Sequence, residues 1–217
     1  MTRFVLPLLA MLVTVAQPAL AKTWVLSGAQ ESRVEQGEIL TYVEESDEPI
    51  RTVTSVGRVN HGAHDVYLVM TDFKNFPRIY NGIRSVSIDD EHGNHVVQSY
   101  DIKAPWPLPG RTVTVETTLD PRHYRFSWHS TAGSMKVYDG RVTAVPAGDR
   151  ACTVYYSAKV DPGYAFVPHW FVTFAQSRVL PSVIQAVRDT LNRHVGPYWA
   201  AGVERPAFSE ETDTSAR

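Results

Sequence analysis

The stretch "DIKAPWPLPGRTVTVETTLD", residues 101–120, joins two segments in which polar and apolar residues alternate. Between them stand Pro105, Trp106, Pro107, Pro109 and Gly110. Proline fixes its own backbone angle and has no N–H to donate, so strand pairing must stop here and the chain must bend. The stretch therefore predicts two strands of one sheet with a sharp corner between them.

Segments of the same alternating kind lie on both sides of this corner, and turn residues separate them. Short turns between consecutive strands are typical of antiparallel pairing. The later segments therefore predict one antiparallel sheet in meander order, preceded by a pair of strands. The segments are residues 38–46 and 50–59, then 83–88, 95–103, 111–119, 124–130, 135–145 and 151–160.

Two other parts of the chain have helical spacing. Apolar residues within 66–73 recur on one helix face, Asn60 can cap the start of that helix, and a short helical turn follows before Gly82. Residues 169–195 form a long pattern with an apolar stripe, which Pro181 should kink or divide. This order predicts an α+β domain whose curved antiparallel sheet buries one face against the C-terminal helix.

The ends of the chain differ in character. Residues 1–21 have a basic start, an apolar run and a small-x-small site at "ALA", which predicts a secretory signal peptide. The alternative is an uncleaved membrane anchor, although the run is shorter than a bilayer span requires. We expect export to the periplasm, a loosely structured lead-in over 22–36, one domain over 37–198, and a polar, disordered tail over 199–217.

Composition narrows the functional classes. The formal net charge is -2 at pH 7 and no Lys/Arg cluster occurs, so we expect no nucleic-acid partner. Cys152 is the only cysteine, which excludes an intramolecular disulfide, and we interpret it as a small buried residue. Asp72 is interpreted as the end of a helix and the cap of the following turn.

Motifs of known enzyme classes do not occur in the sequence. It contains no GxSxG, no HExxH and no Gly-rich phosphate loop. The eight histidines bring no carboxylate or cysteine at metal-ligand spacing. We therefore expect no metal site, no cofactor and no catalytic set.

Large aromatic side chains gather on the faces of the predicted strands and on the last helix. They are Tyr100, Phe126, Trp128, Tyr156, Trp170 and Phe174. One interpretation is an aromatic-rich packed core, since aromatic residues commonly fill cores. The other is a lined cavity for an apolar ligand.

The corner at residues 105–110 adds two further candidates. Arg111 shares the parity of Val113, Val115 and Leu119 and should therefore point inward near the corner. An inward arginine is costly unless it is paired, so it should meet either a buried acid or a polar or anionic group of a ligand. Trp106 can pack over the opening.

Taken in order, these segments resemble the START (lipid-transfer) domains and, more broadly, the helix-grip (SRPBCC) superfamily that includes polyketide cyclases and coenzyme-Q-binding proteins. The likeness runs from about Gly37 to His194. Its most specific pieces are "APWP" at 104–107 followed by Arg111, and "DPG" at 161–163 leading to "PHW" at 168–170. The resemblance implies a curved sheet gripping a long C-terminal helix, with a hydrophobic tunnel between them for one lipid-like molecule.

From the residues and the resemblance together we expect an exported START-like protein that binds a lipid, fatty acid or isoprenoid and could transfer it. We expect a monomer that makes transient membrane contact. Two alternatives stay open: a cyclase- or hydrolase-type enzyme with Asp101 or His129 turned inward, and an interaction protein with a filled core. The predicted ligand-binding residues are Tyr100, Trp106, Arg111, Phe126, Trp128, Tyr156, Trp170 and Phe174.

Overall fold

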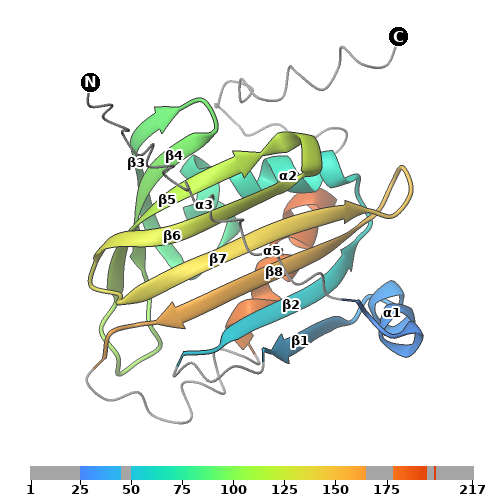
Figure 1. The fold of residues 1–217 in the computed structure, drawn as a ribbon, viewed down its shortest axis with the longest axis horizontal. Helices are drawn as coiled ribbons and strands as arrows, with labels where there is room; N and C mark the ends of the chain where they lie inside the picture. Colours follow the sequence, from blue (N-terminus) through green and yellow to red (C-terminus); the bar gives the residue numbers. More distant parts are fainter. Residues whose placement is uncertain (1–24, 45–49, 165–177, 195–197, 199–217) are drawn as a thin grey trace, which may run out of the picture.

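A computed structural model of the chain describes residues 25–44, 50–164, 178–194 and residue 198. An 8-stranded antiparallel sheet has the order β1-β2-β8-β7-β6-β5-β4-β3 (Figure 1). The predicted meander from β3 to β8 is confirmed, and β2 pairs with β8 to join the first hairpin to it. The strands are β1 Ile39–Val43, β2 Thr52–Val59, β3 Ile83–His92, β4 His95–Ile102, β5 Arg111–Asp120, β6 Arg125–Gly133, β7 Val137–Pro146 and β8 Cys152–Asp161.

Strand β5 shows why the alternating pattern forms this sheet. Val113, Val115, Thr117 and Leu119 are buried, whereas the residues between them are exposed or half-buried. A strand places successive side chains on opposite faces, so one face of β5 lies against the core and the other faces solvent. Arg111 has the parity of the buried set, as predicted.

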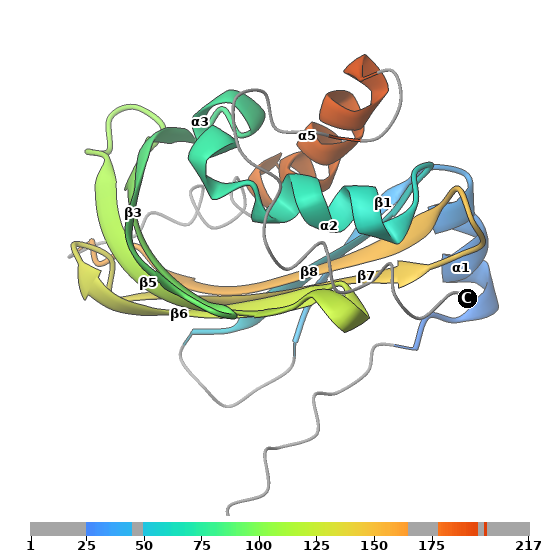
Figure 2. The same ribbon diagram turned by 90° about the horizontal axis from the view of Figure 1, so that it is seen from above.

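The helices lie inside the curve of the sheet. Figure 2 shows α2 (Ala63–Thr71), α3 (Phe76–Ile79) and α5 (Leu180–Arg193) on the concave side, with a short 3-10 turn, η1 (Phe73–Asn75), joining the first two. A second 3-10 turn, η2 (Pro121–His123), connects β5 to β6. The predicted α+β architecture, with two short helices after the first strands and a C-terminal helix against the sheet, is confirmed.

Helix α5 approaches strand β2 closely at a glycine. A Cβ atom added to Gly57 would lie 3.1 Å from Ile184 Cγ2, so a larger residue would push the helix away. The buried stripe of α5, which includes Ile184, Val187 and Leu191, faces the core. Pro181 lies in the first turn of α5, where the missing N–H costs little, and the predicted pattern before residue 178 lies outside the described residues.

The prediction of a loosely structured lead-in over 22–36 is wrong within the described residues. Gly28–Glu35 form helix α1, whose start is closed by reciprocal bonds between Ser27 and Gln30. Such a capping box satisfies backbone groups that the helix itself leaves unpaired. Val34 packs with a small second core on the convex side of the sheet, and β2 is consequently buried on both faces.

Two expectations about helix ends have different outcomes. Helix α2 begins after Gly62 and has no side-chain cap, so the prediction that Asn60 caps it is wrong. Asn60 lies two residues before that position, too far back to bond the first turn. Asp72 ends α2 as predicted, and its carboxylate accepts hydrogen bonds from Asn75 Nδ2 and Tyr198 Oη. None of the helices within the described ranges is long and apolar enough to cross a bilayer.

Candidate functional site

The concave face of the sheet carries a band of aromatic side chains. The Trp128 ring on β6 lies 5.6 Å from the Tyr156 ring on β8 and 5.8 Å from the Tyr138 ring on β7, between ring centroids. Phe126 lies 5.8 Å from Trp128 along the same strand. The prediction that Phe126, Trp128 and Tyr156 face inward is confirmed, because all three are buried in one core cluster.

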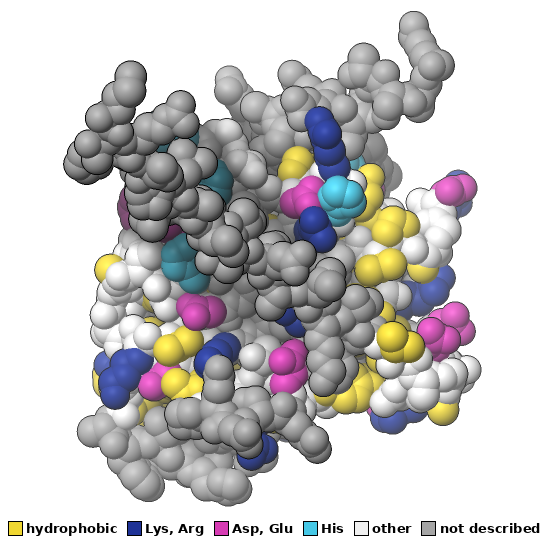
Figure 3. All heavy atoms as spheres, viewed as in Figure 1, with side chains coloured by type: hydrophobic (Ala, Val, Ile, Leu, Met, Phe, Trp, Pro, Cys, Tyr) yellow, Lys and Arg dark blue, Asp and Glu magenta, His cyan; other side chains and the backbone are white. Residues whose placement is uncertain are grey.

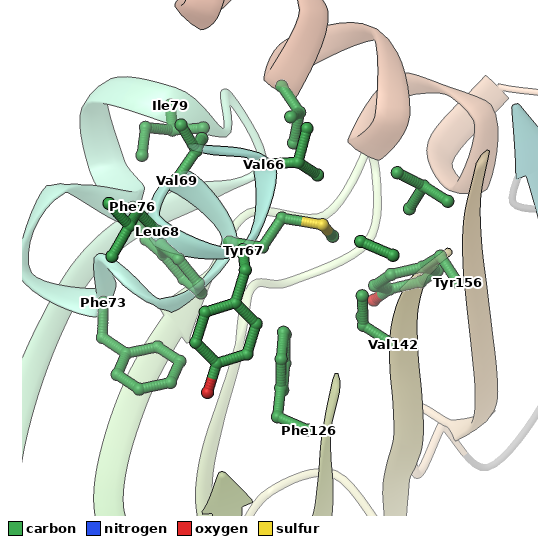
Figure 4. Close-up of a cluster of buried hydrophobic side chains, with 14 of the residues drawn as sticks. Val66, Tyr67, Leu68, Val69, Phe73, Phe76, Ile79, Phe126, Val142 and Tyr156 are labelled. Atoms are coloured by element: carbon green, nitrogen blue, oxygen red, sulfur yellow. The ribbon is translucent and has the colours of Figure 1, made fainter. Parts of the chain in front are cut away.

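The band continues toward β4 through the short helices. Phe76 stacks on Tyr100 at 6.1 Å and meets Tyr80 edge-on at 4.8 Å. Phe73 closes the gap, because its ring lies 5.2 Å from Phe76 and 6.4 Å from Phe126. Figure 4 shows the labelled side chains of α2 and α3 meeting those of the strands in one cluster. Tyr100 is thereby confirmed as an inward residue.

A glycine on β7 makes room for the largest ring of the band. Gly140 pairs directly with Trp128, and a Cβ atom added to Gly140 would lie 2.3 Å from Trp128 Cζ2. The indole therefore lies flat across the neighbouring strand, where any side chain would displace it. The sequence signal was the "DG" pair inside the predicted strand, since a glycine within a strand often marks a close approach.

Four tyrosine hydroxyls belong to this face and remain protonated. Burial, assisted by neighbouring tyrosines, raises the pKa of Tyr80, Tyr100 and Tyr156 above the ordinary tyrosine value. Burial also raises the pKa of Tyr138, and a hydrogen bond with Tyr156 lowers it in part. These side chains are therefore neutral groups at physiological pH that can donate or accept a hydrogen bond.

The sequence analysis missed one polar group on this face, the Gln98 amide. It also treated Trp128 as an apolar ring and did not consider its indole N–H group. Gln98 is 1% exposed, its Nε2 donates to Thr117 Oγ1 at 2.6 Å, and its Oε1 has no partner among the described residues. Trp128 Nε1 is also buried without a partner there. The parity of "HVVQSYDI" could have revealed Gln98, because it shares a face with Val96 and Tyr100.

Arg111 contacts a backbone carbonyl and an aromatic ring of the protein, and neither is the buried acid that was one of the two predicted partners. Its Nε donates to the carbonyl oxygen of Pro162 at 2.7 Å, and its guanidinium carbon lies 3.9 Å from the centre of the Tyr164 ring. Tyr164 Oη in turn donates to the carbonyl oxygen of Pro109 at 2.6 Å. Arg111 therefore ties the proline corner to the end of β8.

Of the remaining predicted site residues, only Trp106 lies in the described part of the chain. Trp106 is 91% exposed, so the expectation that it packs over the opening is wrong. Tyr164 contacts the corner instead, because its Oη donates to the carbonyl oxygen of Pro109 and its ring lies against the Arg111 guanidinium. Trp170 and Phe174 lie outside the described residues.

The residues suggested for acid–base chemistry point outward. Asp101 Oδ2 lies 3.2 Å from Arg84 Nη1, and His129 Nε2 lies 3.5 Å from Glu116 Oε2, both at the solvent-facing surface. Cys152 is fully buried as predicted, and burial raises the pKa of its thiol to about 12. Within the described ranges no group of three or more His, Cys, Asp or Glu side chains could hold a metal ion.

The outer surface offers a different environment. Figure 3 shows charged side chains of both signs interspersed with apolar ones on the convex side. A hollow of about 310 Å³ lies at the sheet edge formed by β1, where it is lined by residues 38–42, Gln30, Pro181 and Arg33, which forms an ion pair with Glu38. An open hollow with an ion pair suits an apolar ligand less well than the aromatic inner face does.

Solved structures share this architecture. A STAR-related lipid transfer protein from Xanthomonas axonopodis is 22% identical, with a TM-score of 0.59 over 71% of this chain and 94% of that one. The Zhui aromatase/cyclase from Streptomyces sp. R1128 is 16% identical, with a TM-score of 0.58 over 70% and 98%. Human STARD10 is 17% identical, with a TM-score of 0.59 over 77% and 70%. At these identities the likeness establishes the fold.

Family membership rests on the sequence match rather than on the structural likeness. Comparison with curated proteins found no match. Comparison with protein families matches residues 59–188, more than half of the chain and the part that runs from the end of β2 through most of α5. The chain is therefore a START-like helix-grip protein that belongs to the family described as polyketide cyclase / dehydrase and lipid transport.

Proposed function

We propose that the chain binds a hydrophobic small molecule between the concave face of the sheet and helices α2 and α5. One observation carries the proposal: a continuous aromatic band includes buried polar atoms, Gln98 Oε1 and Trp128 Nε1, that no described residue satisfies. Apolar surroundings with a few converging polar groups are the usual form of a small-molecule site. A core that merely fills space gains nothing from such atoms, since each costs about 1–3 kcal/mol.

The hydrophobic effect would supply most of the affinity. Each methylene removed from water contributes about 0.8 kcal/mol, so a lipid, fatty acid or isoprenoid tail is held by area alone. The aromatic band spans β4 to β8 and offers such a tail contact along its length. The family description includes lipid transport, and one structural neighbour is named a lipid transfer protein, which supports a ligand of this kind.

The proposal is for a carrier rather than an enzyme. Asp101 and His129 face outward, and the buried tyrosines hold their protons too firmly to act as bases near neutral pH. A cyclase-type reaction is the second candidate, because one structural neighbour is named an aromatase/cyclase and buried hydroxyls would contact the ligand. Prolonged incubation with a bound ligand distinguishes the two functions. A carrier releases the ligand chemically unchanged, whereas a cyclase-type enzyme releases a converted product.

The proposal extends to location and exchange. We propose that the chain is exported to the periplasm, because residues 1–21 have a signal-like pattern. We also propose that it acts there as a monomer. The exposed Trp106 at the proline corner offers a group that suits transient contact with a membrane surface, because tryptophan favours the boundary between apolar and wet regions.

Native mass spectrometry of the protein purified from its host tests the binding proposal, with organic extraction to identify what is bound. We expect a mass increment that matches a hydrophobic molecule and disappears on denaturation. A protein that carries no such increment, and acquires none when offered vesicles of its host's lipids, would contradict the proposal.

Adjacent tyrosines on β8 give a matched control. Tyr156 points to the concave face, whereas Tyr155 packs with the small core on the convex side. We expect Tyr156→Ala to reduce the bound fraction severalfold and Tyr155→Ala to leave it unchanged, with circular dichroism confirming that both variants fold. Equal effects of the two variants would place the ligand elsewhere.

A further inference from the structure

The first observation is the buried amide of Gln98 on β4. Its side chain is 1% exposed, one end bonds Thr117 on β5, and Oε1 has no partner among the described residues. A buried polar atom without a partner costs about 1–3 kcal/mol, which a ligand group that bonds it would recover. The amide therefore offers one hydrogen-bonding position to a molecule on the concave face.

The second observation is the indole N–H of Trp128, one strand further on. Thr117 pairs directly with Trp128 across β5 and β6, so the amide, the hydroxyl and the indole follow one another across three strands. Trp128 is 7% exposed, and its Nε1 has no partner among the described residues. An indole N–H only donates, so its ligand partner must be an acceptor such as a carbonyl, ether or hydroxyl oxygen.

The third observation is the lack of formal charge around these atoms. Among the described residues, Asp72 is the only buried Asp, Glu, Lys, Arg or His, and Tyr198 and Asn75 already bond its carboxylate. Arg111, the predicted partner for a ligand group, donates through its Nε to the carbonyl oxygen of Pro162.

We propose that the site selects an uncharged apolar molecule that carries a hydroxyl or carbonyl oxygen, and that it rejects ionised carboxylate and phosphate head groups. The oxygen accepts from Trp128 Nε1, and a hydroxyl can also donate to Gln98 Oε1. An ionised head would lose its hydration without gaining a cation, which is far more costly than the burial of a neutral oxygen. The inference rests on the proposed function and narrows its ligand class.

Two probes with the same hydrocarbon tail, one with a hydroxyl and one with a carboxylate head group, test this selectivity. Binding of oleyl alcohol and oleic acid to the full chain is compared at about pH 8, below the concentration at which either aggregates. We expect the alcohol to bind at least about tenfold more tightly. Lowering the pH to about 5 should narrow the difference, since part of the acid is then protonated.

The outcomes distinguish the inference from the function on which it rests. Acid that binds as tightly as alcohol at about pH 8 would overturn the inference and leave hydrophobic binding intact. A chain that binds neither probe would overturn the proposed function, and the inference with it. The expected preference for the alcohol supports both.

A variant of Trp128 distinguishes the proposed hydrogen bond from Nε1 to the ligand oxygen from the packing of the ring against the ligand. Trp128→Phe keeps an aromatic ring but removes the N–H, and Trp106→Phe makes the same change on an exposed side chain. We expect Trp128→Phe to weaken oleyl alcohol about fivefold or more while an alkene of equal length binds as before. Equal losses for alcohol and alkene would show that Trp128 acts by packing alone, and would overturn its assignment as donor.

Discussion

At the scale of single residues, Gly140 determines where the Trp128 ring can lie. A methyl group at this position would lie 2.3 Å from the indole and 2.5 Å from the carbonyl oxygen of Ser157. Neither neighbour can yield easily, since one is a buried ring and the other belongs to the backbone of β8. The position therefore couples the fold to the candidate site.

We predict that Gly140→Ala lowers the free energy of unfolding by about 1–3 kcal/mol, the usual cost of overpacking a core. Urea unfolding followed by circular dichroism measures the change. Gly82→Ala is the matched control, because a Cβ atom there has no neighbour within 4 Å. Unchanged stability of Gly140→Ala would contradict this account, because it would mean that the Trp128 ring can adopt another conformation at no cost.

Arg111 illustrates how far residue-level reasoning reaches. Its inward parity was predicted from alternation along β5, but its partners were not, because the Pro162 carbonyl and the Tyr164 ring follow it by about fifty residues. A backbone carbonyl also leaves no mark in the sequence. Alternation thus predicts the face of a side chain, whereas its contacts depend on the pairing of distant strands.

We predict that Arg111→Gln lowers the free energy of unfolding by about 1 kcal/mol, because a charge-assisted bond and a cation–π contact are lost. The affinity for oleyl alcohol should stay within about twofold of the unaltered chain. Calorimetric unfolding and a binding titration measure the two quantities. A large loss of affinity at unchanged stability would contradict this prediction and indicate that Arg111 contacts the ligand.

At the scale of elements, the grip of the sheet on α5 depends on its contact with β2. Ile184 approaches Gly57 closely, and the Arg188 guanidinium bonds the carbonyl oxygen of Arg58 at 2.6 Å and that of Gly37 at 3.0 Å. Burial lowers the pKa of Arg188. Both packing and hydrogen bonds thus fix the middle of α5 against the sheet.

We predict that Gly57→Val loosens this contact and lowers the free energy of unfolding by about 1–3 kcal/mol. Hydrogen exchange should show faster exchange of the α5 amides than in the unaltered chain, while β4 and β5 stay protected. Gly82→Val supplies the control. Exchange that rises equally in all elements would point to general destabilisation rather than to a loosened helix.

The elements differ in how well their sequences predict them. The strands from β3 to β8 alternate strongly between turns and were all predicted, as was the inward set Tyr100, Phe126, Trp128 and Tyr156. Helix α1 was missed although its capping box stands in the sequence as Ser27 and Gln30, because its apolar face is small. The contact of Tyr80 with the band could not be predicted, since it depends on how α3 meets the sheet.

At the scale of the whole molecule, the buried tyrosines link stability to pH. Their pKa values are raised by burial, so the folded chain keeps protons that the unfolded chain releases near about pH 10. The unfolded state then binds fewer protons, and the free energy of unfolding falls as pH rises. The Cys152 thiol, whose pKa is raised to about 12, acts in the same direction.

We predict that the contribution of the tyrosines is nearly constant below about pH 9, that the contribution of Cys152 is lost from about pH 8.5 upward, and that stability falls steeply above about pH 10. Urea midpoints measured between about pH 8 and 11 test this expectation. Tyr138→Phe should reduce the slope, because it removes one of the linked protons. A midpoint that does not change over that range would contradict the burial of the hydroxyls in the folded chain.

The central claim is that an uncharged hydrophobic ligand lies on the concave face, and photo-crosslinking tests it most directly. A long-chain alcohol with a diazirine in its tail is bound, irradiated and located by peptide mass spectrometry. The claim predicts that inward residues such as Tyr100, Trp128 and Tyr156 are labelled. Excess oleyl alcohol should suppress this labelling, because it competes for the same site. Labelling confined to the hollow beside β1 or to Trp106 would contradict it.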